Sequence, residues 1–251
     1  MADFDSAGVR LHYVRTGPEG GRPIVLVHGF ASDYELNWAG SRWQETMTNA
    51  GFGVLGLDCR GHGHSDKPHD PAAYDRREMA ADVVRLLDHL GIPRADFLGY
   101  SMGARIGLEL AIAEPGRLGR VVLGGMGQNA TDQSGPGGEL IARRLRGDQA
   151  VDHPLAQMFY EFASSRPIND LEALACCITG PQTAITNAQL GAISVPIAVM
   201  AGDKDNLARG ADRLAAAIPG ACHVSIEGRT HMNAVPARQF KQAALEFLEA
   251  G

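Results

Sequence analysis

The hydrophobic positions along the chain fall into short continuous apolar runs separated by stretches with helical spacing. Six runs of strand length are PIVLVHG (23–29), FGVLGLD (52–58), ADFLGY (95–100), RVVLGGM (120–126), PIAVMAGD (196–203) and CHVSIEG (222–228). Continuous apolar runs of this length are typical of strands buried on both faces of a parallel sheet. The stretch VRLHYVRTG (9–17) alternates instead, which predicts a strand of an antiparallel hairpin ending near residues 18–21.

Three stretches between these runs have the spacing of amphipathic helices: 76–92, 103–115 and 237–250. The first ends at Gly91 with Pro93 beyond it, which is a typical stop signal. Strands that alternate with helices predict an α/β fold with a mostly parallel sheet. Because crossovers are right-handed, we expect a doubly wound sheet with helices on both faces.

Residues 128–195 interrupt this alternation. TDQSGPGGEL (131–140) is typical of a loop, whereas HPLAQMFYEFASS (153–165) and NDLEALACCI (169–178) predict short helices. We interpret 128–195 as a helical insertion that covers the carboxyl edge of the sheet. Residues 1–127 and 196–251 then form the core, and the whole chain is a single domain.

Composition and charge argue against several classes of partner. The 251 residues are 45% apolar and 21% charged, and the net charge of −6 comes without a long basic run. This disfavours nucleic acid and anionic membranes as partners and leaves a small molecule. No apolar stretch is long enough to span a bilayer, and the acidic start does not resemble a signal peptide, so we expect a cytoplasmic protein. The four cysteines form no CxxC pair, which predicts reduced thiols.

Polar residues at three strand ends suggest nucleophilic catalysis. Ser101 follows one apolar run, Asp203 and Asp205 follow another, and His231 follows the last. A serine needs a base within hydrogen-bond reach, a histidine is such a base, and a carboxylate orients the histidine. His223 and His153 are weaker candidates for the base, because neither follows the last strand.

The stretch GYSMG (99–103) predicts a sharp turn from strand to helix that projects Ser101 outward. The backbone N–H of Met102 would then lie at a helix N-terminus, facing a developing oxyanion. The natural source of a second donor is the turn after His28 and Gly29, where the Phe30 N–H can point into the same pocket.

The chain resembles the α/β-hydrolase family over essentially its whole length. The matching motifs, in family order, are HGF (28–30), DCRGHGHS (58–65), GYSMG (99–103), GDKD (202–205) and GRTH (228–231). The resemblance implies an α/β-hydrolase fold, a Ser101–Asp205–His231 triad, an oxyanion hole from the Phe30 and Met102 amides, and a small helical cap. Asp203 would then support the turn or the neighbouring end of the sheet, and an acid after the preceding strand, Asp132, is an alternative. His28 would orient the oxyanion loop.

This pattern predicts a serine hydrolase that cleaves a small carboxylic ester or lactone through an acyl-enzyme, similar to small bacterial esterases and enol-lactone hydrolases. Carbon–carbon bond hydrolases, thioesterases and perhydrolases of the family use the same triad and stay open as alternatives. A receptor-like protein that only binds its ligand is a further alternative. A serine nucleophile argues against haloalkane dehalogenases and epoxide hydrolases, which attack with a carboxylate.

We expect neither a metal nor a cofactor. His62 and His64 lack a third ligand at suitable spacing, and Gly125–Ala130 matches the dinucleotide pattern GxGxxA without opening a helix. Trp38 and Trp43 either line the substrate pocket or pack in the core. A substrate carboxylate has five candidate partners, unless these side chains face solvent: Arg105, Arg143, Arg144, Arg146 and Arg166.

Overall fold

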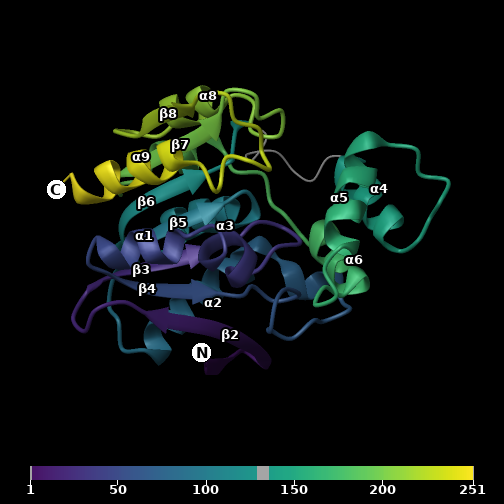
Figure 1. The fold of residues 1–251 in the computed structure, drawn as a ribbon, viewed down its shortest axis with the longest axis horizontal. Helices are drawn as coiled ribbons and strands as arrows, with labels where there is room; N and C mark the ends of the chain where they lie inside the picture. The colour runs from purple at the N-terminus through teal and green to yellow at the C-terminus, as the bar shows by residue number, and fades with distance from the viewer. Residues whose placement is uncertain (1, 129–135, 251) are drawn as a thin grey trace.

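The computed structural model describes residues 2–128 and 136–250 and is built on an eight-stranded sheet (Figure 1). The strand order is β1-β2-β4-β3-β5-β6-β7-β8, and the neighbours from β4 to β8 are parallel. The strands are β1 (Ala2–Ser6), β2 (Val9–Thr16), β3 (Arg22–Val27), β4 (Phe52–Leu57), β5 (Ala95–Tyr100), β6 (Leu118–Gly124), β7 (Ile197–Gly202) and β8 (Cys222–Ile226). The predicted mostly parallel α/β sheet is confirmed.

The N-terminal hairpin is present, but its partner strand differs from the expectation. Strand β2 pairs with the preceding β1 through the turn at Ala7 and Gly8, and its other edge is antiparallel to β4. The turn predicted near residues 18–21 therefore leads to β3, which is not a neighbour of β2. Strand β1 was not predicted because it has only five residues, two of them aspartates, and buries only Phe4 and Ser6.

Helices cover both faces of the sheet, as a doubly wound fold requires. Helices α1 (Trp43–Asn49) and α9 (Arg238–Glu249) contribute to the apolar core of one face. Helices α2 (Arg76–His89), α3 (Met102–Ala113) and α8 (Ala211–Ala216) contribute to that of the other. The three helices expected from periodicity are therefore α2, α3 and α9. Within the described residues, no helix is both long and apolar enough to cross a membrane.

Between β6 and β7, the described residues form four helices: α4 (Pro136–Leu145), α5 (Pro154–Ser164), α6 (Leu171–Thr179) and α7 (Asn187–Gly191). Figure 1 shows α4, α5 and α6 gathered beside the sheet. The loop expected over 131–140 is wrong from Pro136 onward, where α4 begins. Proline is well suited to the first turn of a helix, and the burial of Ile141, Ala142 and Leu145 outweighs the low helix propensity of the two glycines that follow it.

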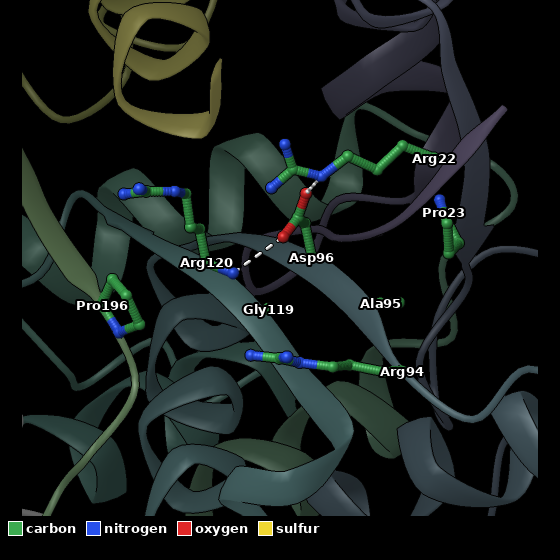
Figure 2. Close-up of a pocket in the computed structure, with 8 residues that line it drawn as sticks. All are labelled: Arg22, Pro23, Arg94, Ala95, Asp96, Gly119, Arg120 and Pro196. Atoms are coloured by element: carbon green, nitrogen blue, oxygen red, sulfur yellow. Dashed lines mark hydrogen bonds and ion pairs between the residues drawn. The ribbon is translucent and has the colours of Figure 1, made fainter. Parts of the chain in front are cut away.

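The amino ends of the strands carry a cluster of charges that ties the C-terminal helix to the sheet. Figure 2 shows the buried Asp96 between Arg22 and Arg120, in a cavity of about 340 Å³. The Asp96 carboxylate accepts the Arg120 N–H at 2.7 Å and pairs with Nε of Arg22 at 2.6 Å. The two guanidinium groups also donate to the carbonyls of Leu248 and Ala250 at the end of α9. This cluster stabilises the fold at the end of the sheet opposite to the predicted catalytic residues.

Candidate active site

Ser101 lies at the turn between β5 and α3 in a strained backbone conformation. Its φ of 54° and ψ of −109° belong to a region that non-glycine residues rarely adopt, at a cost of about 1–3 kcal/mol. The turn also needs glycine at position 103, because a Cβ there would overlap the Val27 carbonyl oxygen of β3. The surrounding chain thus holds the backbone of Ser101 in this turn at the carboxyl end of the sheet.

The structure brings Ser101, His231 and Asp205 together in one hydrogen-bonded chain. Nε2 of His231 lies 3.0 Å from Oγ of Ser101, and Nδ1 lies 2.8 Å from Oδ2 of Asp205. The other Asp205 oxygen accepts the N–H groups of Leu207 and Ala208, and the carboxylate is fully buried. A carboxylate held in this way fixes the histidine tautomer with Nδ1 protonated, which leaves Nε2 free to accept the serine proton.

The alternatives to Asp205 and His231 lie elsewhere. Asp203 accepts the Arg229 N–H at 3.2 Å and so supports the adjoining turn, the role expected of it. His223 lies in β8 and His153 precedes α5, and neither contacts Ser101. The alternative acid Asp132 lies outside the described residues, as does the end of the Gly125–Ala130 motif.

Tyr100 positions the histidine loop, a role that sequence reasoning missed. Its hydroxyl donates to the His231 carbonyl at 2.5 Å, and its ring centroid lies 5.3 Å from the imidazole. Burial raises the pKa of the Tyr100 phenol, so the hydroxyl keeps the proton that it donates. The only sign of this role in the sequence is a tyrosine directly before the serine. Its hydrogen-bond partner could not be predicted, because His231 lies 131 residues further along the chain.

Two backbone N–H groups near Ser101 are free to bind an oxyanion. Met102 is the first residue of α3, where N–H groups lack partners within the helix. Phe30 follows His28 and Gly29 after β3. Among the described residues, no protein group accepts a hydrogen bond from either the Phe30 or the Met102 N–H.

The loop that carries Phe30 is held by polar groups from several elements. His28 is fully buried; its Nδ1 lies 2.8 Å from the Gly29 carbonyl oxygen, and its Nε2 accepts the Cys59 N–H at 3.0 Å. Burial lowers the pKa of His28, so the ring is neutral with one donor and one acceptor nitrogen, as these bonds require. Oδ1 of Asn37 accepts the Gly29 N–H at 3.1 Å. This contact from Asn37 was not expected from sequence.

The segment between α5 and α6 contacts the same loop. Arg166 forms an ion pair with the buried Asp33, and Nδ2 of Asn169 donates to the Ala31 carbonyl at 3.1 Å. Phe159 of α5 meets Phe30 edge-to-face, with ring centroids 5.6 Å apart. These contacts link the helical segment before β7 to the loop that presents the Phe30 N–H.

A cavity of about 380 Å³ opens beside Ser101 and His231. Apolar side chains make up much of its wall: Phe30, Leu36, Phe159, Phe162, Met232, Val235 and Pro236. Trp38 and Trp43 are not part of this wall, so core packing is the correct alternative for both. They are fully buried, meet edge-to-face at 5.7 Å, and pack in the core that includes Phe240 of α9.

The motif DCRGHGHS (58–65) forms a turn that is buried except at His64. Asp58 accepts the N–H groups of Tyr34 and His64, and Nδ1 of His62 lies 3.0 Å from the Arg60 carbonyl oxygen. In the part of the chain that the structure describes, no three His, Cys, Asp or Glu side chains are close enough to hold a metal ion. The four cysteines are free, with Cys222 exposed and the other three buried.

Comparisons with known proteins agree with this architecture. A family model described as alpha/beta hydrolase fold matches residues 22–134. The 3-oxoadipate enol-lactonase 2 of Acinetobacter baylyi is 30% identical over 219 residues, covering 81% of this chain and 79% of that protein. The crystal structure of the enol-lactonase from Burkholderia xenovorans LB400 has a TM-score of 0.80 and 28% identity, covering 98% of this chain and 99% of that one.

Other curated relatives match over a shorter segment. Epoxide hydrolase A of Mycobacterium tuberculosis is 39% identical over 100 residues, which are 40% of this chain and 30% of that protein. For several such relatives the chain spans less than half of their length. The enol-lactonase match nevertheless extends over most of both sequences, and the sheet, the strained serine turn and the helical segment before β7 occupy the places that the resemblance implied. The chain therefore belongs to the α/β-hydrolase superfamily.

Proposed function

We propose that this protein is a serine hydrolase that cleaves a small carboxylic ester or lactone through an acyl-enzyme on Ser101. The observation that carries the proposal is the continuous chain of hydrogen bonds from Asp205 through His231 to Ser101. A serine hydroxyl is a weak nucleophile unless a base takes its proton, and this arrangement supplies both the base and the group that orients it. The relatives named as enol-lactonases support a lactone or ester as the substrate class.

In the proposed reaction, His231 takes the Ser101 proton as Oγ attacks the substrate carbonyl. The negative charge that develops on the carbonyl oxygen is bound by the N–H groups of Phe30 and Met102, whose freedom from protein acceptors supports this role. The imidazolium then returns the proton to the leaving alcohol. Water, activated by His231, attacks the acyl-enzyme and restores the free serine. One oxyanion donor of this kind contributes about 100- to 1,000-fold to kcat.

The helices of 128–195 would act as a cap over this site. Phe159 and Phe162 of α5 line the cavity beside Ser101, which supports a role in excluding water from the bound substrate. The contacts of Arg166 and Asn169 with the oxyanion loop support the same docking arrangement.

Hydrolysis of p-nitrophenyl acetate by the wild type and by Ser101→Ala tests the proposal. We expect Ser101→Ala to lose turnover by at least about a thousandfold, while its circular dichroism and unfolding midpoint stay near those of the wild type. Ser225→Ala is the matched control, because Ser225 is an exposed serine of β8 outside the cavity lining, and it should retain most of the activity. Equal activity in Ser101→Ala and wild type would exclude the mechanism, and a wild type without turnover would favour the receptor-like alternative.

A further inference from the structure

The cavity beside Ser101 is lined by few side chains that can carry a charge. Apart from His231, its polar side chains are neutral: Ser32, Asn37, Ser41, Tyr100 and Ser101. The rest of its lining is aliphatic, aromatic or glycine, and the wall includes Leu36 and Met232, the two exposed large hydrophobic side chains of the described residues. A solvent-facing apolar rim of this kind suits a ligand that is itself apolar.

The five arginines that the sequence suggested as partners of a substrate carboxylate bind other groups of the protein instead. Arg105 forms a buried pair with Glu109, and Arg166 pairs with Asp33. Arg144 donates to Gln157 at 2.9 Å and lies over the Tyr160 ring. Two more pair with acids of the helical segment: Arg143 with Asp148, and Arg146 with Glu172. In the part of the chain that the structure describes, none of the five arginines lines the cavity.

The segment 129–135, which lies outside the described residues, supplies no cation either, since its sequence NATDQSG contains no lysine, arginine or histidine. Of the two acids near the site, Asp33 already has its cation in Arg166, and Asp205 adds a negative charge behind His231. A carboxylate bound in the cavity would therefore lose its hydration without gaining a cationic partner, apart from a protonated His231. Burying an unpaired charge is strongly unfavourable.

We infer that the substrate of this hydrolase is an uncharged ester or lactone with apolar groups, and that esters carrying a free carboxylate are rejected. This inference rests on the proposed function and narrows it. It also separates the chain from the enol-lactonase to which it is 30% identical, since a lactone made from 3-oxoadipate, a dicarboxylic acid, keeps one carboxylate free.

Two esters of the same length test the inference: p-nitrophenyl hexanoate and the mono-p-nitrophenyl ester of adipic acid. Both have a six-carbon acyl chain, and they differ only in the methyl or carboxylate at its end. We expect kcat/KM for the hexanoate to exceed that for the adipate ester by at least about a hundredfold at pH 7.5 and low salt. Each rate is corrected for hydrolysis without enzyme.

A variant that adds a cation should reverse part of this preference. Leu36 lines the cavity and is 38% exposed, so a lysine there can lay its stem along the apolar wall and keep its ammonium in water. Leu36→Lys should raise kcat/KM for the adipate ester by about tenfold or more relative to the hexanoate. Leu36→Met, of similar volume and without charge, should keep the wild-type preference.

Comparable kcat/KM values for the two esters, or a preference for the adipate ester, would overturn the inference while leaving the serine mechanism intact. An unchanged preference in a folded Leu36→Lys would also contradict it, because the missing cation would then not be the cause. Hydrolysis of neither ester by the folded wild type would contradict the proposed function itself, and the inference with it.

Discussion

At the scale of single residues, the site depends on which of two neighbouring carboxylates meets the histidine. Asp203 and Asp205 lie on the same turn after β7, but only Asp205 is buried against Nδ1 of His231. Asp203 is exposed and accepts a backbone N–H from Arg229. The two side chains thus allow a test in which one site serves as the control for the other.

Asp205→Asn should lower kcat by about 10³–10⁴-fold while leaving KM within a few-fold, because an amide no longer stabilises the imidazolium and favours the wrong tautomer. Asp203→Asn should keep nearly full activity. Steady-state kinetics on one p-nitrophenyl ester measures both variants. Similar losses in the two variants would show that the turn as a whole, and not the Asp205 contact, supports turnover.

At the scale of elements, the helical segment before β7 and the loop after β3 that carries Phe30 form one connected unit. Asp33 is almost fully buried, accepts the Leu36 N–H at 2.8 Å, and pairs with Arg166 from the segment after α5. Removing the cation leaves a buried carboxylate without an opposite charge, which costs more than removing both charges together. The position of the Phe30 N–H should therefore depend on Arg166.

Arg166→Met is expected to lower kcat by about ten- to a hundredfold, since small displacements of catalytic groups are costly. The double variant Asp33→Asn/Arg166→Met should recover part of that loss. Arg146→Met removes an ion pair with the exposed Glu172 and should have little effect. A double variant that performs no better than Arg166→Met, or an Arg146→Met that is equally impaired, would refute the coupling.

Elements and site positions could be predicted from the sequence where the local pattern of residues determines the structure. They could not be predicted where contacts with residues distant in the chain determine it. Continuous apolar runs identify β3 to β8, and the polar residues that follow them include Ser101 and His231. Strand β1 and helix α4 were missed because each is stabilised by its neighbours against a weak local signal. The contacts of Asn37, Tyr100 and Arg166 join residues that only the fold brings together. Arg166 and its partner Asp33, for example, are 133 positions apart in the sequence.

At the scale of the whole molecule, buried neutral histidines make stability depend on pH. His28 and His62 are fully buried, and burial lowers the pKa of both below the ordinary value of about 6.5. Below that pH the unfolded chain binds protons at these histidines and the folded protein does not. The stability that they contribute is therefore present above about pH 6.5 and is lost as the pH falls.

Urea unfolding should show a free energy that decreases from pH 7.5 to pH 5.5, by up to about 1.4 kcal/mol per pH unit for each buried histidine below pH 6.5. Burial raises the pKa of Asp82, which opposes this trend at acidic pH because the folded state then takes up a proton first. His62→Gln should flatten the dependence, whereas His223→Gln, at an exposed position, should not. An identical slope in wild type and His62→Gln would contradict this explanation.

Covalent labelling tests directly whether Ser101 is the nucleophile. The protein is incubated with a fluorophosphonate and digested with trypsin, which releases residues 95–105 (ADFLGYSMGAR) as a peptide with Ser101 as its only serine. We expect this peptide from the folded wild type to gain the mass of the phosphonyl group, and the same peptide from urea-unfolded protein and from Ser101→Ala to gain none. An active enzyme whose 95–105 peptide stays unmodified, or whose label maps to another residue, would contradict the assignment of Ser101 as the nucleophile.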